Sequence, residues 1–328
     1  MNIARRQVYR FALGFAAALV LTAPARAQTG DWPNRPIKLM VPFLPGTSPD
    51  VIARTLTDAM SQILKQAIVI ENRPGAAGNL GAQTAARAAP DGYTWLYAAS
   101  PLATSMRMYK NPGFDVLKDF TMVGRMTITD LLVIAPVDAG LRTVGDLLER
   151  ARKNPGKLNF ASGGVGSPAH MGAELMLSVG GATATHVPFK GASESLNAVV
   201  GKQVDFALTI TSVSLAQWKA GKVAVLGITS GKRNPAAPQV PTLIEQGLSG
   251  VEVVSFGGLA VPTGTPPAIV KRINEVMREA LARSEVNAKL TAQGALPAPS
   301  SPEEHTEFMR AEIALTEKMM KAARLEAQ

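Results

Sequence analysis

The sequence predicts an α/β fold in which helices flank parallel β-sheets. From residue 37 onward, short apolar runs alternate with segments whose apolar residues have helical spacing. This alternation is typical of parallel sheets covered by helices. Two of the apolar runs lead into turns rich in glycine, serine or proline, at residues 42–50 and 161–170. The length favours two lobes, and the sequence contains no evident internal repeat or low-complexity linker.

In the first half, the apolar run 37–43, bounded by Pro36 and Pro45, predicts a buried strand. The spacing of Val51, Leu56 and Met60 predicts a helix over 50–64. The further elements expected here are strands at 67–70, 94–99 and 131–135 and helices at 80–89 and 143–153, the last with Thr143 as N-cap.

In the second half, a strand at 157–160 leads into the second glycine turn. The same patterns predict helices at 168–178, 193–200, 214–220 and 241–247, strands at 184–188, 204–208, 224–229 and 253–261, and a helical tail at 266–283, 286–293 and 302–323. Ligands of open parallel sheets bind beyond the carboxyl ends of the strands, where both turns are expected to lie.

Each of the two turns precedes a predicted helix. The first turn of a helix exposes unpaired backbone N–H groups and the positive end of the helix dipole. It therefore binds anions without a charged side chain. The two turns lie over a hundred residues apart in the sequence, so we expect them to grip one small anion from two sides.

The first 27 residues predict a secretory signal peptide. Arginines at positions 5, 6 and 10 precede an apolar stretch at 11–21, which is too short to span a bilayer as a mature helix. Ala25-Arg26-Ala27 matches a cleavage site after Ala27. We expect an exported protein, with an uncleaved membrane anchor as the alternative.

Charge and cysteine content exclude several classes of function. The signal segment carries four arginines and no acidic residue, so its removal lowers the formal net charge from +9 to +5. Without a dense basic run, the chain is not expected to bind nucleic acid. The sequence has no cysteine, and its three histidines are far apart, without metal-site spacing. We therefore expect no thiol catalysis, no metal site and no cofactor.

Two enzyme hypotheses are weaker. Residues 164–169 fit the dinucleotide pattern G-x-G-x-x-A. The next predicted strand, 184–188, brings no acidic residue to bind a ribose. Ser162 does not lie in the G-x-S-x-G elbow of a serine hydrolase. A non-catalytic binding protein is the better interpretation.

A series of short motifs runs in order along nearly the whole mature chain: WPNRPI at 32–37, VPF at 41–43, ENRPGAAG at 71–78, PDGYT at 90–94, DF at 119–120, the turn at 162–170, HVPFKG at 186–191, PTLIEQG at 241–247 and PTGTP at 262–266. In these motifs the chain resembles a known family, the Bug-type receptors of tripartite tricarboxylate transporters.

This resemblance implies a type II-like periplasmic binding protein, a Venus flytrap of two α/β lobes joined by two crossover strands at 128–134 and 253–259. The domain prediction is a signal peptide at 1–27, lobe 1 at 28–130 plus 254–300, lobe 2 at 131–253, and a C-terminal helix at 301–328 packing near the lobe junction. The implied ligand is a small carboxylate in the cleft between the lobes.

The resemblance also implies the ligand-binding residues. Lobe 1 would supply Leu44, Pro45, Gly46, Thr47, Ser48, Asp50 and Ser100, and lobe 2 would supply Ser162, Gly166, Ser167, His170 and Phe189. The family has Gly-Gly where this chain has Gly46-Thr47. Thr47 adds a methyl and a hydroxyl group to the turn and resists a positive φ, so it is expected to narrow the pocket or to add a hydrogen-bond donor.

Several of these residues have structural alternatives. Asp50 could cap its helix rather than bind ligand, and Ser167, just before Pro168, is a typical N-cap. His170 could serve packing and hydrogen bonding. Arg73 and Lys190 are expected to brace loops or lie on the surface.

The family implies that the receptor captures an organic acid and delivers it to the membrane permease subunits of a tripartite tricarboxylate transporter. We expect it to act as a monomer and without catalysis. The alternative function is a sensor that presents its bound ligand to a membrane signalling protein. The sequence leaves the identity of the carboxylate open.

Overall fold

The computed structural model describes residues 32–327 of the chain. Ten strands of this part belong to one hydrogen-bonded network. Its main path runs β2-β1-β3-β9-β4-β7-β5-β6, with β8 and β10 also paired to β4. All of these elements lie in the unit that begins at Pro33. The predicted signal peptide, residues 1–27, lies outside the described residues.

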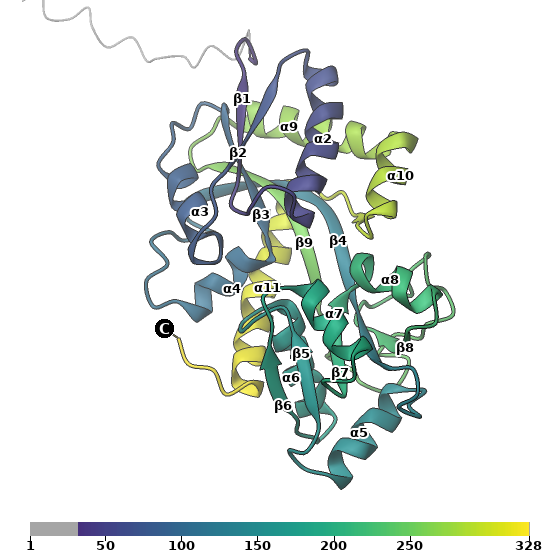
Figure 1. Ribbon diagram of the computed structural model, residues 1–328. Helices are drawn as coiled ribbons and strands as arrows, with labels where there is room; N and C mark the ends of the chain where they lie inside the picture. Colours follow the sequence, from purple (N-terminus) through teal and green to yellow (C-terminus); the bar gives the residue numbers. More distant parts are fainter. Residues whose placement is uncertain (1–31, 328) are drawn as a thin grey trace, which may run out of the picture. The chain divides into compact units, whose positions relative to one another are not determined.

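The first group of elements surrounds three parallel strands (Figure 1). β1 pairs with β2 on one side and with β3 on the other. Along α2, Leu56 and Met60 are buried, as the helical spacing predicts, whereas Val51 is exposed and Ile52 lies on the buried face instead. The elements are β1 (Ile37–Val41), α2 (Ser48–Leu64), β2 (Ile68–Asn72), η1 (Ala76–Gly78), α3 (Asn79–Ala86), β3 (Thr94–Ala99) and α4 (Ser100–Met108).

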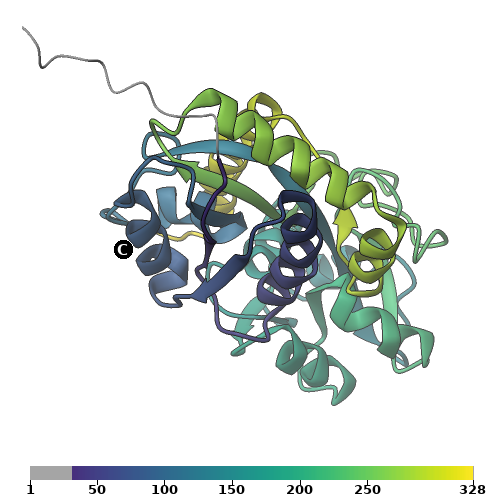
Figure 2. The same ribbon diagram turned by 90° about the horizontal axis from the view of Figure 1, so that it is seen from above.

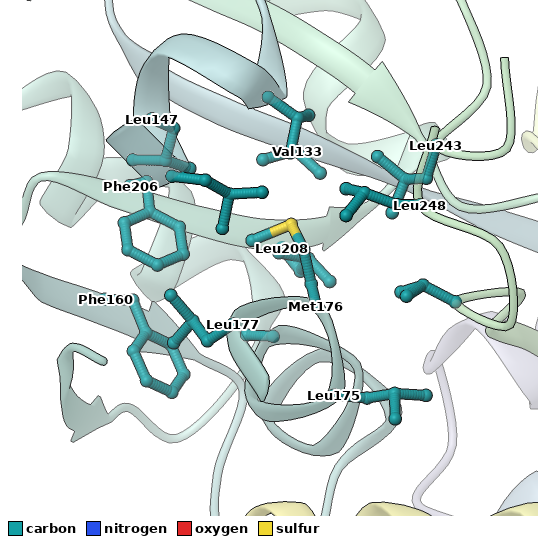
Figure 3. Packing of buried hydrophobic residues seen from close by; sticks show 14 of the residues in the cluster. Val133, Leu147, Phe160, Leu175, Met176, Leu177, Phe206, Leu208, Leu243 and Leu248 are labelled. Carbon is teal, nitrogen blue, oxygen red and sulfur yellow. The ribbon is translucent and has the colours of Figure 1, made fainter. Parts of the chain in front are cut away.

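The second group contains the parallel strands β5, β6 and β7 with helices around them. Its core brings Met176 of α6 together with Phe206 and Leu208 of β7, and Leu147 of α5 lies in the same cluster (Figure 3). The elements are α5 (Val144–Lys153), β5 (Asn159–Ser162), α6 (Pro168–Val179), β6 (Thr185–Pro188), α7 (Ala192–Val200), β7 (Phe206–Ile210), α8 (Thr211–Lys219) and β8 (Val223–Ile228).

Two long antiparallel strands connect the groups. β4 (Phe120–Pro136) pairs with β9 (Val254–Pro262) through Asp130, and from Leu131 onward it pairs with β7 and β8. β9 in turn pairs with β3 of the first group. The predicted crossover segments, 128–134 and 253–259, coincide with these strands, so the predicted two-lobe α/β fold is confirmed.

The last helices cover the connecting strands. α9 (Pro267–Ala282) packs against α2 and β4, and Figure 2 shows it as the long green helix above the sheet. After α10 (Ser284–Ala292) and the short strand β10 (Leu296–Pro297), α11 (Pro302–Ala322) packs against β4, α4 and α6. α11 therefore contacts both groups, although the lobe boundaries at 130/131 and 253/254 stay a prediction.

The structure differs from the prediction in five places. The helix predicted at 241–247 is wrong, because only hydrogen-bonded turns form there. Thr242 and Glu245 cap each other, and Gly247, with φ +86°, ends the turn before a second one can follow. The sequence analysis also missed α4, η1 and β10, and it found only the last part of β4.

Candidate functional site

Two adjoining pockets lie where the two glycine turns meet α4 and the connecting strands. The larger has a volume of about 420 Å³ and is lined by both turns, by η1 and by α4. The smaller, of about 140 Å³, is lined by the start of α2 and by residues of β3, β4 and β9. Phe43, Pro101 and Pro168 border both pockets, so the two are adjacent, and together they are called the cleft below.

In the first turn, the residue with a positive φ is a glycine. Gly46 has φ +77°, while Thr47 is extended, with φ −75° and ψ 161°. The Thr47 hydroxyl donates to the Leu44 carbonyl at 2.7 Å. Threonine therefore fits this turn without strain, and its hydroxyl hydrogen is already used within the turn.

Asp50 holds this turn in place through hydrogen bonds. Its buried carboxylate accepts hydrogen bonds from the Gly46 N–H (2.9 Å), the Asn72 amide (2.9 Å) and the Arg54 guanidinium (2.9 and 3.0 Å). Burial by itself raises the pKa of Asp50, but the hydrogen bonds from Arg54, Gly46 and Asn72 outweigh it and hold that pKa below its usual value. Asp50 lines neither pocket, which favours its structural role.

The second turn is held by a histidine. Gly166 has φ +75°, and its N–H donates to Nδ1 of His170 at 3.1 Å. Ser167 is the N-cap of α6, because its hydroxyl accepts the His170 N–H at 3.2 Å. A ring nitrogen that accepts a hydrogen bond carries no proton, so His170 is neutral here, with its proton on Nε2.

A stack of rings lies beneath this turn. The rings of His170 and His186 are 3.8 Å apart between centroids, and Phe160 stacks on His186 at 4.9 Å. Burial, and after it the neighbouring His186, lower the pKa of His170 to about 4. Burial also lowers the pKa of His186, whose Nε2 lies 2.7 Å from the Ser162 hydroxyl. This Ser–His contact lies inside the fold, since Ser162 is fully buried.

α4, which the sequence analysis missed, forms one side of the larger pocket. The residues of this segment that line the larger pocket are Pro101, Thr104, Ser105, Met108 and Tyr109. The signal that could have revealed this helix is Pro101, two residues after the end of β3, because proline is favoured in the first helical turn.

Some of the predicted site residues line the two pockets and others do not. The larger pocket is lined by Leu44, Thr47, Gly166 and Ser167, and the smaller by Ser48. The predicted residues that line neither pocket are Pro45, Gly46, Asp50, Ser100, Ser162, His170 and Phe189.

Two of these other residues serve the fold. The Ser100 hydroxyl accepts the Phe256 N–H of β9 at 2.8 Å. Phe189 packs against the hydrophobic cluster that includes Leu196 and Val199. Ser100 directly precedes Pro101, which borders both pockets, whereas the Phe189 N–H donates to the Ser162 carbonyl behind the second turn at 3.0 Å.

The cleft contains no charged lining residue. No Lys, Arg, Asp, Glu or His borders either pocket in the described part of the chain, and Arg73 and Lys190 lie outside both linings. Within residues 32–327, the N–H groups of Ser48 and Val165, one in each turn, have no internal acceptor. The available partners for an anion are therefore backbone N–H groups and hydroxyls.

Two further searches of the described residues gave negative results. No cluster of three or more His, Asp or Glu side chains is placed to hold a metal ion. No described helix is both long enough and apolar enough to cross a membrane.

Comparison with known proteins adds a family to this geometry. Residues 52–325 match the family described as "Tripartite tricarboxylate transporter family receptor". A relative from Pseudomonas sp. (strain P51), the UPF0065 protein in the tcbD-tcbE intergenic region, is 34% identical over 328 residues, covering 99% of this chain and 96% of the relative.

Solved structures agree with this match. The periplasmic binding protein BugD superposes with a TM-score of 0.75 at 31% identity, covering 90% of this chain and 100% of BugD. The R. palustris protein Rpa4515 with adipate gives a TM-score of 0.79 at 31% identity, covering 91% of this chain and 100% of Rpa4515. The family resemblance drawn from the motifs is thus confirmed, and this chain belongs to the receptor family of tripartite tricarboxylate transporters.

Proposed function

We propose that this chain is a periplasmic receptor that captures a small organic acid between its two lobes and delivers it to a tripartite tricarboxylate transporter. The observation that carries this proposal is the cleft itself, where two glycine turns and two helix N-termini converge without any charged side chain. A similar protein, Rpa4515, was solved with adipate, a carboxylate.

The carboxylate is held by the first turn and the start of α2. The Ser48 N–H is free there, and the dipole of the 17-residue helix α2 adds positive potential. The second turn, with Gly166 and Ser167, closes over the ligand from the other lobe. Binding then contacts both lobes, which is what drives closure of such receptors.

The receptor performs no catalysis on its ligand. Ser162 and His186 are the only nucleophile–base pair suggested by the described geometry, and the Ser162 side chain is fully buried. No hydrogen bond to a carboxylate orients His186 within residues 32–327. Incubation of protein with excess ligand, followed by mass spectrometry, is expected to return the ligand unchanged.

Export and assembly are part of the same proposal. The signal peptide is cleaved after Ala27, the mature chain acts as a monomer in the periplasm, and the permease subunits are its membrane partners. N-terminal sequencing of periplasmic material checks the cleavage, and light scattering checks the mass. Uptake that persists after deletion of the permease genes would contradict the transport role.

Calorimetric titration of the mature protein, residues 28–328, with a panel of carboxylates tests the binding function. A ligand at 100 times its Kd stabilises the folded state by about 2.7 kcal/mol, so thermal shift gives an independent readout. The corresponding amides, which lack the negative charge, serve as controls. Equal binding of acids and amides would contradict an anion site.

A further inference from the structure

One helix contributes side chains to the cores of both strand groups. α11 is continuous from Pro302 to Ala322. It packs against α4 of the first group, α6 of the second group and the connecting strand β4 (Figure 1). A continuous helix couples the positions of its two ends, because each backbone N–H inside it is bonded to the carbonyl four residues earlier.

The first half of α11 belongs to the core of the first group. Met309 and Ile313 are buried in a hydrophobic cluster whose other members all come from residues 40–122 and 256–260. These ranges contain β1, β3 and the parts of β4 and β9 that pair beside them. The first half of the helix therefore moves with the first group.

The second half of α11 belongs to the core of the second group. Met319 and Met320 are buried in the cluster shown in part in Figure 3, whose other buried members all come from residues 131–253. Leu315 and Leu325 pack against the same cluster. The two ends of one helix are thus anchored in two separate cores.

This arrangement opposes rotation of one group relative to the other. If the groups rotate, α11 must either bend or withdraw one end from its core. Withdrawal exposes apolar side chains to water and leaves a cavity behind, and both effects are unfavourable. The strands β4 and β9 are less restrictive, because a hinge needs φ and ψ changes at only a few residues of each strand.

The residue between the two anchored ends is a threonine. Thr316 is the buried residue of α11 between Ile313 and Met319. Its hydroxyl donates to the carbonyl of Glu312, four residues earlier, at 2.8 Å. Back-bonding of this kind slightly destabilises helices and often bends them. A turn with lower resistance to bending therefore lies between the two cores.

We propose that α11 is a third connection between the two lobes, which holds them in a narrow range of orientations and lets them move only as far as it bends at the turn of Thr316. The two crossover strands set the axis of the motion, and α11 limits its extent. This inference concerns the ligand-free protein and does not depend on which ligand the cleft binds.

Spin labels measure the distance between the two groups in the ligand-free protein. Since the chain has no cysteine, Arg87→Cys and Lys157→Cys, both at exposed positions, place one label in each group. In this labelled background, Met319→Ala is expected to broaden the distance distribution from pulsed EPR about twofold or more, because the lobes then populate further orientations.

Met176→Ala is the matched control for this measurement. It removes the same type of side chain from the same cluster, but on α6, so the distribution should keep its width. Circular dichroism verifies that both variants are folded. An unchanged width in a folded Met319→Ala protein, or equal broadening in the two variants, would overturn the proposal.

A second pair of variants tests the bend without removing an anchor. Thr316→Gly is expected to broaden the distribution as well, because glycine makes the turn between the two cores more flexible. Thr306→Gly is its control, since the Thr306 hydroxyl makes the same kind of bond, to the Pro302 carbonyl at 2.8 Å, within the first half of the helix. Equal widths in the two glycine variants would overturn the placement of the bend.

Discussion

Gly166 shows at the scale of one residue how the cleft depends on backbone freedom. Its φ of +75° is a conformation that other residues rarely adopt, and an added Cβ would also meet Met108 at 2.5 Å. Gly46 has a similar φ of +77°, but a Cβ there would meet nothing within 4 Å. The two glycines therefore separate the effect of backbone strain from the effect of a steric clash.

Gly166→Ala and Gly46→Ala are expected to lower the free energy of unfolding by similar amounts, of about 1 kcal/mol, because both force alanine into a positive φ. Ligand affinity should fall about tenfold or more in Gly166→Ala only, since Met108 must move. Calorimetry and urea unfolding of both variants give the two quantities. Equal losses of affinity would mean that the position of Met108 is irrelevant to binding.

His170 predicts a pH dependence of stability. Its pKa in the folded protein is about 4, below the value of about 6.5 for an unperturbed histidine. The unfolded chain therefore binds more protons between these values, and the free energy of unfolding falls as the pH drops from about 6.5 toward 4. Protonation of Nδ1 would also end its hydrogen bond with the Gly166 N–H.

His170→Gln is the variant that isolates this effect, because glutamine does not titrate and its amide oxygen can accept a hydrogen bond. Urea unfolding at several pH values is expected to give a shallower decline for the variant than for the natural protein. Acidic groups contribute equally to both proteins, so the difference belongs to His170. Parallel curves would contradict the depressed pKa.

At the scale of elements, β4 is fixed where it passes from one group of strands to the other. Asp130, at this point, is buried and accepts hydrogen bonds from Thr211, from the Ser230 hydroxyl at 3.3 Å and from the Asn234 amide at 2.9 and 3.1 Å. These partners come from α8 and from the segment after β8. One carboxylate thus ties two segments to the crossover strand.

Asp130→Ala is expected to destabilise the protein by about 3 kcal/mol, because it leaves buried donors without an acceptor. Asp130→Asn should cost less, since it keeps one acceptor oxygen. Asp138→Ala, on the exposed turn after β4, is the control and should change stability by less than about 1 kcal/mol. Denaturant unfolding measures all three, and a near-neutral Asp130→Ala would show that the cluster does not secure the crossover.

At the scale of the whole molecule, ligand binding is expected to draw the two lobes together. β4 and β9 are the long strands that join the groups, and both glycine turns contact the same larger pocket. A ligand that contacts both turns binds the closed state more tightly and shifts the population toward it. Closure would cover the side chains of Leu44 and Val165, which are exposed.

Small-angle scattering of the mature protein with and without saturating ligand checks this closure. The radius of gyration is expected to decrease when ligand binds, and Val165→Ser at the same saturation should show the same decrease. Superimposable profiles, together with calorimetric proof of saturation, would contradict closure. A receptor already closed without ligand would be recognised by the smaller radius of gyration of its ligand-free form.

The sequence by itself determined the elements whose signals are local. Apolar runs ended by proline or glycine gave β1 and β5, and helical spacing gave α2 and α11. The capping residues Thr143 and Ser167 also act within a few residues of their own helices. The family match rests on similar short motifs, and it was confirmed over residues 52–325.

Only the tertiary structure decided which residues face the cleft. Asp50 and His170 belong to the motif segments, yet each turns inward to hold a glycine N–H. Met108 and Tyr109, far from either turn in the sequence, line the larger pocket because α4 packs beside it. Local sequence patterns determine the type and position of a single element, whereas contacts between distant elements depend on the packing of the whole core. The sequence therefore determined where the two glycine turns lie in the chain, and the tertiary structure decided which residues line the pockets between them.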